Sequence, residues 1–254
     1  MSTKPPDFPP LAPESLLVFL ARDRCLRGPW LAGWEAWLTP EEWARAERFL
    51  CRAARRDYLL GKAMTRRVIA HYAGIAPGAL RFVTNPYGKP AVQGAAVGLA
   101  FSLSHCAGHA ALALARELGH VGVDLEAPQA SAVDWALSRS CFDPRETAAL
   151  EALPQGERAA GFLRLWVLKE AFVKAVGLGL SLPLDSFAFL PGPGGAYRLH
   201  PPAAGPWSRQ RWDYGTFRFA DCHGGWVVGA GRDGRRVEFI DWAAGESGGD
   251  DPAH

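Results

Sequence analysis

Apolar and polar residues alternate along the chain with two periods, one typical of helices and one typical of strands. The clearest helical period lies at 164–177, where apolar residues recur every three or four positions and predict one buried stripe. The stripe consists of Leu165, Leu168, Phe172, Ala175 and Val176. Gly177 then ends the predicted helix. Glu170, Lys174 and Trp166 share a polar face, and the opposite side of the helix is expected to be apolar throughout. The Glu170 and Lys174 pair is either an ordinary surface ion pair or part of a charged site.

Two further helical segments have recognisable starts. Thr39 is expected to cap a helix, with Glu42 completing the capping box. From there one long helix, or two helices in series, is expected to run to about Tyr72. Asp143 is expected to cap another helix, and a short helical pattern surrounds residues 134–137.

Three arginines lie in the first helical segment. Arg45, Arg52 and Arg56 are spaced by seven and four residues, so on one continuous helix they would lie within about 40° of each other. Such a face is commonly solvated. It could also grip a phosphate group or an acidic partner helix, because guanidinium groups bind phosphate with two parallel hydrogen bonds.

Strands are expected wherever alternating or short apolar runs lie between Gly- and Pro-rich turns. These runs are 16–20, 80–83, 101–105, 110–115, 121–126, 187–189, 197–200, 211–219 and 226–230. Each half of the chain therefore reads strand, helices, strands. We expect an α/β (α+β) fold of two pseudo-symmetric halves, 1–119 and 120–244, each a small sheet packed with helices, with a ligand cleft between them. Residues 245–254 are rich in Gly and Asp and are expected to form a disordered tail.

Composition narrows the function classes. The 254 residues are 48% hydrophobic and 21% charged with a net charge of +2, which is ordinary for a soluble protein and predicts no general attraction to nucleic acid or membranes. No apolar run reaches the ~18 residues of a membrane span, and the Pro-rich start does not resemble a signal peptide. The five cysteines form no CxxC motif, which argues against a disulfide framework or structural zinc and fits a reducing cytoplasm.

Two carboxylates stand out on the strand at 121–126. Asp124 and Glu126 are two residues apart, so they emerge on one face while Val123 and Leu125 point to the other. Neighbouring carboxylates on an otherwise apolar strand must reach water or share a cation. Oxygen ligands with room for water and phosphate favour Mg²⁺ over a closed Ca²⁺ cage or zinc. Two solvated carboxylates would leave the same pattern.

Two loops before this strand carry further polar groups. The sequence Asn85-Pro86-Tyr87-Gly88-Lys89-Pro90 predicts a turn, and its ring, bare backbone and ammonium would also suit a purine with a nearby phosphate. Ser104 and His105 end a predicted strand and could hold phosphate oxygens. His105 beside Cys106 permits a nucleophilic thiol, but adjacent residues on an extended chain point to opposite faces and do not form a catalytic pair.

Taken in order, these motifs resemble the larger, Sfp-type 4′-phosphopantetheinyl transferases. The resemblance covers about residues 41–187, and the C-terminal strands fit in outline. The matching stretches are Tyr87-Gly88-Lys89-Pro90, Ser104-His105, Gly122 to Glu126, Trp166 to Lys174 and Gly177 to Phe187. Ser102, Cys106 and Val167 differ from the residues common in that family. None of the three is an implied ligand, so only details of the phosphate contacts are affected.

The resemblance implies a Mg²⁺-dependent transferase, a holo-carrier-protein synthase. Such an enzyme moves the phosphopantetheine arm of coenzyme A onto a serine of an apo acyl or peptidyl carrier protein and releases adenosine 3′,5′-bisphosphate. Residues 1–119 would form the nucleotide side of the coenzyme A site, and residues 120–244 would carry the metal and the catalytic helix. The two halves in one chain argue against the short, trimeric type and imply a monomer. Carriers of fatty acid, polyketide and nonribosomal peptide biosynthesis are not distinguished.

The resemblance also implies roles for individual residues. Asp124, Glu126 and Glu170 would hold Mg²⁺, with Mn²⁺ as an alternative, together with the pyrophosphate of coenzyme A. Glu170, directly or through water, would take the proton of the serine, and Lys174 would neutralise charge on the pyrophosphate. The remaining coenzyme A contacts would come from Ser104 and His105 at phosphate oxygens, from Tyr87, Gly88, Lys89 and Pro90 in the nucleotide pocket, and from one of Arg45, Arg52 and Arg56 at the 3′-phosphate.

Two other functions remain open. One is a metal-dependent phosphohydrolase acting on a nucleotide, because the same carboxylates would serve attack by water. The other is a non-catalytic module that binds coenzyme A or a carrier protein. For the carrier, the resemblance implies docking near residues 128–142, where Trp135, Leu137 and Phe142 would give apolar contacts and Arg139 a charge.

Overall fold

The computed structural model describes residues 8–94, 98–116, 119–128, 135–192, 196–203, 205–230 and 236–242. The expected tail at 245–254 lies outside these ranges. The α-helices are α1 (Pro40–Glu47), α2 (Arg52–Ala73), α3 (Trp135–Cys141), α4 (Pro144–Glu151) and α5 (Gln155–Val176). The strands of the first half and its partner from the C-terminus are β1 (Ser15–Arg22), β2 (Phe82–Thr84), β3 (Pro90–Val92), β4 (Leu99–Cys106), β5 (His109–Arg116) and β11 (Arg236–Asp241). Those of the second half are β6 (Val121–Glu126), β7 (Ala188–Pro191), β8 (Tyr197–His200), β9 (Arg211–Phe219) and β10 (Cys222–Ala230).

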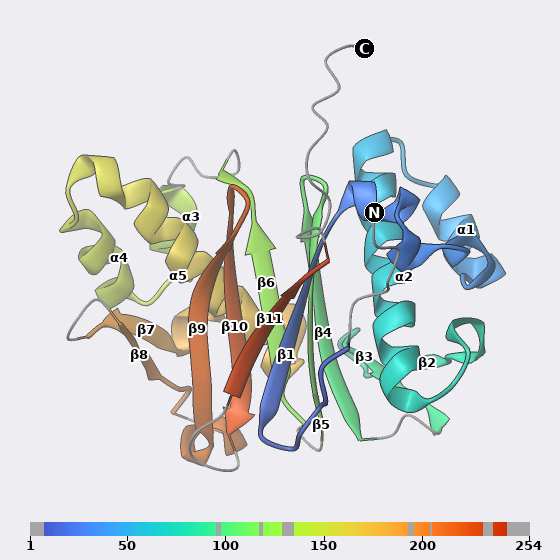
Figure 1. Ribbon diagram of the computed structural model, residues 1–254. Coiled ribbons are helices and arrows are strands. Elements are labelled where there is room, and N and C mark those ends of the chain that lie inside the picture. Colours follow the sequence, from blue (N-terminus) through green and yellow to red (C-terminus); the bar gives the residue numbers. More distant parts are fainter. Residues whose placement is uncertain are drawn as a thin grey trace.

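Two sheets stand between two groups of helices (Figure 1). One sheet has the strand order β11-β1-β5-β4 and the other the order β6-β10-β9, with two small hairpins, β2-β3 and β7-β8, beside them. Helix α2 covers the outer side of the first sheet and α5 covers the outer side of the second (Figure 1). Each main sheet thus carries one helix of 22 residues. This mixed α/β architecture of small sheets packed with helices confirms the expected fold class.

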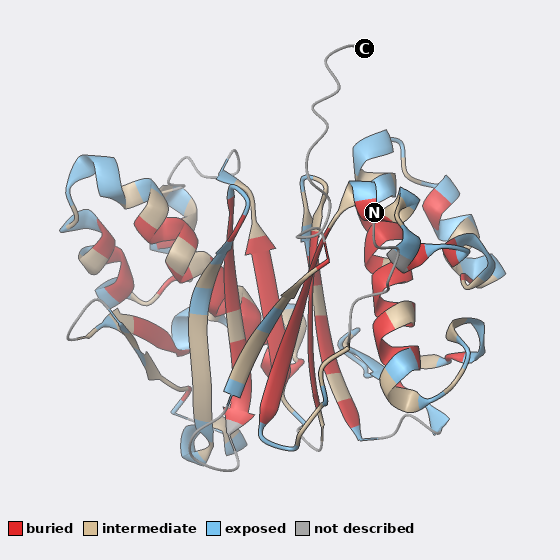
Figure 2. Cartoon of the chain, viewed as in Figure 1, coloured by how far each residue is buried: buried red, intermediate tan, exposed pale blue. Residues whose placement is uncertain are grey.

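The apolar alternation of the strands separates three cores. One face of β1 and β5 packs on α2, and the other face packs on β6 and β10 in the space between the sheets. Val121, Val123 and Leu125 belong to this inner core, so Asp124 and Glu126 emerge on the opposite face of β6, as the sequence predicts. A third core lies around α5. Figure 2 shows the buried residues gathered in the central strands and along α2 and α5.

Glycines allow α5 to lie directly on the second sheet. A Cβ atom at Gly122 of β6 would stand 1.8 Å from the carbonyl oxygen of Ala171, and one at Gly225 of β10 would stand 2.7 Å from that of Val167. Both distances are far below any van der Waals contact, so helix backbone occupies the space that a side chain would need. The helix residues next to these contacts are therefore held close to the residues that follow Gly122 along β6.

A buried ion pair fixes the other side of α5. Lys169 and Glu146 are both fully buried, with Nζ and Oε2 2.6 Å apart. Lys169 also donates to the carbonyl oxygen of Phe187 at 2.9 Å, while Glu146 accepts from the backbone N–H groups of Phe189 and Asp143. Every charge is thus compensated by hydrogen bonds, which a buried ion pair requires. The expectation that this side of the helix is apolar throughout is wrong, because it carries the charged Lys169. The carboxylate that neutralises Lys169 comes from Glu146 on α4, and the pattern within one helix cannot reveal a partner on another.

Most elements lie where the sequence places them. Thr39 and Asp143 each form a capping box, and Gly177 ends α5 in the left-handed conformation with φ of 79°. The strand expected at 80–83 starts later, at Phe82, since the Leu80 carbonyl accepts a hydrogen bond from Arg66 of α2. Strand β11 was not expected. It belongs to the second half of the chain but pairs in parallel with β1 of the first half. The paired residues are about 220 positions apart in sequence, and no local pattern predicts such a pairing. Within the described ranges, none of the helices combines the length and apolar character of a membrane span.

The contact between α5 and β6 can be tested by adding one methyl group. Gly122→Ala should lower the free energy of unfolding by about 1–3 kcal/mol, because the helix must move away from the strand. The matched control is Gly156→Ala near the exposed start of α5, where a Cβ meets nothing within 4 Å. That control should be neutral or stabilising by up to about 1 kcal/mol. Urea denaturation measures both, and equal stability of Gly122→Ala and the unaltered chain would show that the helix does not lie directly on β6.

Candidate active site

One cavity collects the acidic residues singled out in the sequence. It has a volume of about 380 Å³ and lies where β4, β6 and α5 meet. Its lining includes Ser104, His105, Asp124, Glu126, Trp166, Glu170 and Lys174. The strand carboxylates and the helix carboxylate, more than 40 residues apart in sequence, therefore face the same space. The shared face predicted for Trp166, Glu170 and Lys174 also opens into this cavity.

Asp124 is the most enclosed of the three carboxylates, with 3% of its surface exposed. Its Oδ1 accepts hydrogen bonds from Lys174 Nζ at 2.6 Å and Ser104 Oγ at 2.9 Å. Lys174 Nζ also donates to Ser104 Oγ at 3.1 Å. The second oxygen, Oδ2, is buried and has no hydrogen-bond partner. A buried carboxylate oxygen without a partner costs free energy, which a further positive group or donor would recover.

The other two carboxylates are partly buried and electrostatically strained. Burial raises the pKa of Glu126, and the neighbouring Asp124 carboxylate raises it further. Burial and then the Asp124 charge likewise raise the pKa of Glu170. Lys174 counteracts both effects, and the indole N–H of Trp166 donates to Glu126 Oε1 at 3.3 Å. The single ammonium of Lys174 thus faces three carboxyl groups, so the cavity has an excess of acidic groups over cations.

The residues of this cavity fit a hard divalent cation. Within the described residues, no three His, Cys, Asp or Glu side chains stand close enough together to hold a metal as they are placed, and the Lys174 ammonium is the cation in contact with Asp124. Ser104 and His105 also line the cavity, and its three carboxylates supply oxygen donors that carry negative charge, one of them the unpartnered Asp124 Oδ2. Oxygen donors of this kind, in a site open to further ligands, suit Mg²⁺ or Mn²⁺.

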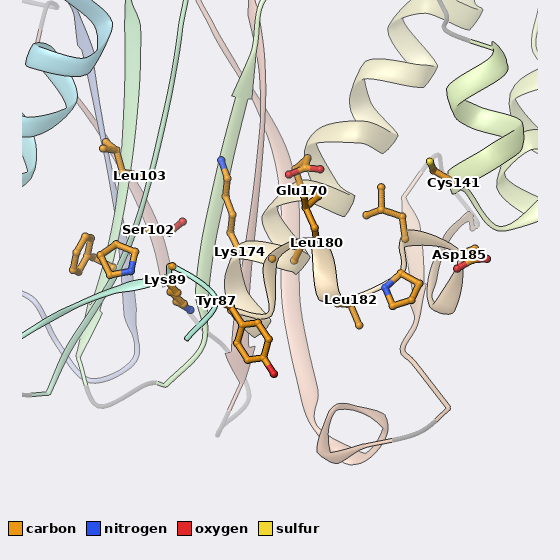
Figure 3. A pocket seen from close by; sticks show the side chains of 18 of the residues that line it. Tyr87, Lys89, Ser102, Leu103, Cys141, Glu170, Lys174, Leu180, Leu182 and Asp185 are labelled. Atoms are coloured by element: carbon orange, nitrogen blue, oxygen red, sulfur yellow. The ribbon is translucent and has the colours of Figure 1, made fainter. Parts of the chain in front are cut away.

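A larger cavity of about 810 Å³ adjoins the acidic one and shares Leu103, Glu170 and Lys174 with it. Figure 3 shows Glu170 and Lys174 on α5, between Ser102 and Leu103 on one side and Cys141 and Asp185 on the other. The turn residues Tyr87, Gly88, Lys89 and Pro90 line this cavity. Four residues expected to contact the nucleotide therefore border a space that opens beside the acidic cluster.

The ammonium of Lys89 binds backbone carbonyl oxygens of the second half, a contact that the sequence did not predict. Its Nζ donates to the carbonyl oxygens of Ala175 at 2.7 Å and Val121 at 3.3 Å. From the same turn, Asn85 Nδ2 donates to the carbonyl oxygen of Gly177 at 2.8 Å. A cation and a donor placed on the last carbonyls of a helix stabilise its C-terminal end. This turn of the first half thus clamps the end of α5 and the start of β6, the two elements that carry the acidic cluster.

The arginines do not share the face predicted for them. Helix α1 ends at Glu47 and α2 begins at Arg52, so Arg45 belongs to a different helix from Arg52 and Arg56. The prediction was wrong because it required one continuous helix. Arg56 is bound to Asp23 at 2.7 Å, and the guanidinium of Arg45 lies 5.5 Å from the ring centre of Tyr58. None of the three arginines lines either cavity.

The segment expected to dock a carrier protein, residues 128–142, is less exposed than predicted where the structure describes it. Residues 129–134 lie outside the described ranges. Phe142 is only 3% exposed and stacks on Phe162, so it cannot offer an apolar contact to a partner. Leu137 packs on the core around α5, and Arg139 is exposed and paired with Glu151 at 2.8 Å.

Sequence reasoning missed how β4 and β6 are joined. Ser102 Oγ accepts a hydrogen bond from the Val123 N–H at 3.1 Å, which satisfies a backbone donor at the edge of the second sheet. Ser104, expected to hold phosphate, forms a parallel link to Asp124. The spacing of Ser102 and Ser104 on one strand face was the available signal, because both must point toward the same neighbour.

The clamp formed by Lys89 can be tested through pH. Burial lowers the pKa of Lys89 from its usual 10.5 to about 8, so between these pH values the unfolded chain binds more protons than the folded chain. The free energy of unfolding of the unaltered chain should therefore rise from pH 8 toward 10.5 relative to Lys89→Met. Urea denaturation at several pH values measures this difference. The control Lys62→Met removes a lysine that pairs with Glu42, and the same pH-dependent difference in that variant would contradict the assignment.

Comparison with known proteins places this arrangement in a family. A model of the 4′-phosphopantetheinyl transferase superfamily matches residues 120–230. A second model, described as the N-terminal region of 4′-phosphopantetheinyl transferase, matches residues 29–117. The two matches are consecutive and together span most of the chain. Their border falls between β5 of the first sheet and β6 of the second.

Individual relatives agree with these matches. The chain is 34% identical over 148 residues to the 4′-phosphopantetheinyl transferase HetI of Nostoc sp., covering 58% of this chain and 62% of that protein. It is 30% identical over 153 residues to the 4′-phosphopantetheinyl transferase Sfp of Bacillus subtilis, covering 60% of this chain and 66% of that protein. The match thus spans slightly less than two thirds of the length of either relative.

A solved holo-(acyl-carrier-protein) synthase from Bacillus anthracis, described as a complex with coenzyme A, aligns with 44% of this chain and 95% of its own at 15% identity. The TM-score of 0.36 is too low to carry an argument. The family models and the relatives confirm the resemblance read from the sequence motifs, and we conclude that the chain belongs to the 4′-phosphopantetheinyl transferase superfamily, among its Sfp-type members.

Proposed function

We propose that this protein is a Mg²⁺-dependent 4′-phosphopantetheinyl transferase. It moves the phosphopantetheine arm of coenzyme A to a serine of an apo acyl or peptidyl carrier protein and releases adenosine 3′,5′-bisphosphate. The observation that carries the proposal is the meeting of Asp124, Glu126 and Glu170 with Lys174 in one cavity. Relatives named as transferases of this type support it.

The two adjoining cavities would take the parts of coenzyme A. Glu170 and Lys174 line both of them, so a pyrophosphate at this junction would have an organic group on the larger, more open side. The turn Tyr87 to Pro90 would line the nucleotide pocket there, through the Tyr87 ring and the bare backbone of Gly88. Lys89 would support this pocket by holding α5, since its ammonium already binds two carbonyl oxygens.

The acidic residues would hold the cation and the protons. Asp124, Glu126 and Glu170 would be the ligands of Mg²⁺, which would offset the charge of the pyrophosphate. In the transfer step the serine hydroxyl oxygen bonds to the phosphorus that carries the pantetheine. The bond from that phosphorus to the bridging oxygen breaks, and adenosine 3′,5′-bisphosphate leaves with the electron pair. Glu170, directly or through water, would accept the serine proton, a task that its raised pKa favours.

Lys174, Ser104 and His105 would act on the phosphate oxygens. The ammonium of Lys174 would neutralise charge that develops on the pyrophosphate oxygens as the bond breaks. It donates to Asp124 and Ser104, and its third N–H group would be free to bind a phosphate oxygen. His105 is exposed at the cavity and would reach a phosphate oxygen from β4.

One of the arginines of α1 and α2 would bind the 3′-phosphate. Arg52 and Arg56 remain four residues apart on one helix, and Arg45 is separated from them by the break between α1 and α2. Asp57, next to Arg56, accepts a hydrogen bond from the Gly108 N–H at 2.9 Å, which brings this end of α2 beside the turn that follows His105. Arg45 also reaches this end of α2, where its guanidinium lies over the ring of Tyr58, so any one of the three would be the ligand. By the resemblance, the doubled architecture within one chain would let the protein act as a monomer, and a cytoplasmic location remains a prediction.

An intact-mass assay tests the function. Purified protein, coenzyme A, Mg²⁺ and a small panel of apo carrier proteins should yield a carrier that has gained one phosphopantetheine. Bisphosphate release without a carrier would instead indicate a phosphohydrolase, and binding without turnover would indicate a non-catalytic module. Either result with every carrier would contradict the proposal.

Asp124→Ala should lower kcat/KM at least about 100-fold at any Mg²⁺ concentration, because the variant loses a cation ligand and a partner of Lys174. The control is Asp221→Asn in the exposed turn between β9 and β10, which should keep full activity. The intact-mass assay measures both rates. Retained activity of Asp124→Ala would remove this residue from the site.

A further inference from the structure

Two cysteine thiols from different halves of the molecule meet beside the acidic cavity. Cys106 is the last residue of β4 and Cys222 is the first residue of β10. Their sulfur atoms are 3.8 Å apart although 116 residues separate them in sequence. Both are free thiols. A disulfide bond needs sulfur atoms about 2.05 Å apart, so a small approach of the side chains would suffice to join them.

The ends of two hairpins hold these thiols in place. The turn after Cys106 contains Ala107 with φ of 45°, and the turn before Cys222 contains Ala220 with φ of 50°. Non-glycine residues adopt this left-handed conformation at a cost, so their surroundings must hold them there. The hairpins also touch directly, because the rings of His109 and Phe219 meet edge to face at 5.5 Å. The short distance between the sulfur atoms therefore belongs to a fixed junction.

The thiol pair borders the proposed site on both strands. Cys106 follows His105, which lines the acidic cavity. Cys222 precedes His223, which is paired with Glu126 across β10 and β6. A bond between the two sulfur atoms would connect the first sheet to the second sheet at the end of β6. The covalent link would thus hold together two walls of the cavity.

The two sulfur atoms differ in access. Cys222 is 1% exposed, whereas Cys106 is partly exposed. An oxidant from solution would therefore meet Cys106 first, and Cys222 lies in position to complete the reaction. Of the other cysteines, Cys51 is exposed just before α2, and Cys141 lines the larger cavity.

We propose that Cys106 and Cys222 form a reversible disulfide that staples the two halves of the protein. The oxidant would be a low-molecular-weight disulfide. The Cys106 thiolate attacks one of its sulfur atoms, which forms a mixed disulfide and releases one thiol. The Cys222 thiolate then attacks Cys106 Sγ, and the second small thiol leaves. Overall, two protein thiols are oxidised to one disulfide, and the small disulfide is reduced to two thiols, which take up the two protons.

The staple should stabilise the folded protein against heat. Joining residues 106 and 222 removes the conformational freedom of a long loop from the unfolded chain. For a chain of this size the melting temperature should rise by about 5–15 °C. The effect does not depend on the transferase activity, so failure of the proposed function would leave it unaffected.

Oxidation by glutathione disulfide tests the proposal in the full chain. The experiment uses Cys51→Ser as background, which removes the exposed thiol. After incubation, intact mass should show the loss of two hydrogen atoms without bound glutathione at this pair. Peptide mapping should recover one cross-linked species that joins Cys106 to Cys222. The melting temperature should rise as stated and return to its starting value after treatment with dithiothreitol.

The matched variants are Cys106→Ser and Cys222→Ser in the same background. Neither should lose two hydrogen atoms, and neither should gain thermal stability on oxidation. A mixed disulfide at Cys106 that never resolves would overturn the proposal. A cross-link to another cysteine, or a cross-link between the named pair without a rise in melting temperature, would overturn it as well.

Discussion

The site depends on one close approach, that of helix α5 to the second sheet. Gly122 and Gly225 leave no side chain between sheet and helix, and the helix backbone fills the space where their Cβ atoms would stand. The buried pair of Lys169 and Glu146 holds the helix from its other side, and the turn with Asn85 and Lys89 holds its end. Because α5 is restrained at three places, the register of Glu170 and Lys174 against β6 is set by packing.

This restraint explains why an electrostatically unfavourable cluster persists. Asp124, Glu126 and Glu170 repel one another, and burial raises the pKa of both glutamates. Lys174 and Ser104 compensate one oxygen of Asp124 and leave the other without a partner. Such strain is expected where a fold is organised around a ligand instead of its own stability. A divalent cation with phosphate oxygens would satisfy all three acids at once.

Local patterns predicted the elements, and pairs of distant residues escaped prediction. The stripe on α5, the caps at Thr39 and Asp143, and the shared face of Asp124 and Glu126 follow from periodicity and side-chain chemistry within a few residues. The Lys169 pair, the parallel partner of β1 and the contact between Cys106 and Cys222 each join segments far apart in the chain. The prediction of an arginine face failed because a four-residue break separates α1 from α2 and puts Arg45 on a different helix from Arg52 and Arg56. The resemblance to a family gathered the acidic residues into one site, which spacing alone could not do.

The central claim is that two strand carboxylates and one helix carboxylate form a single divalent cation site. Electron paramagnetic resonance of Mn²⁺ added to the purified chain tests it directly, because bound and free Mn²⁺ give distinct signals. We expect one ion per chain, with an affinity at least about 10-fold lower in Glu170→Gln and unchanged in Glu157→Gln, an exposed position of the same helix. Equal Mn²⁺ affinity in the unaltered chain and Glu170→Gln would show that the helix carboxylate takes no part in the site.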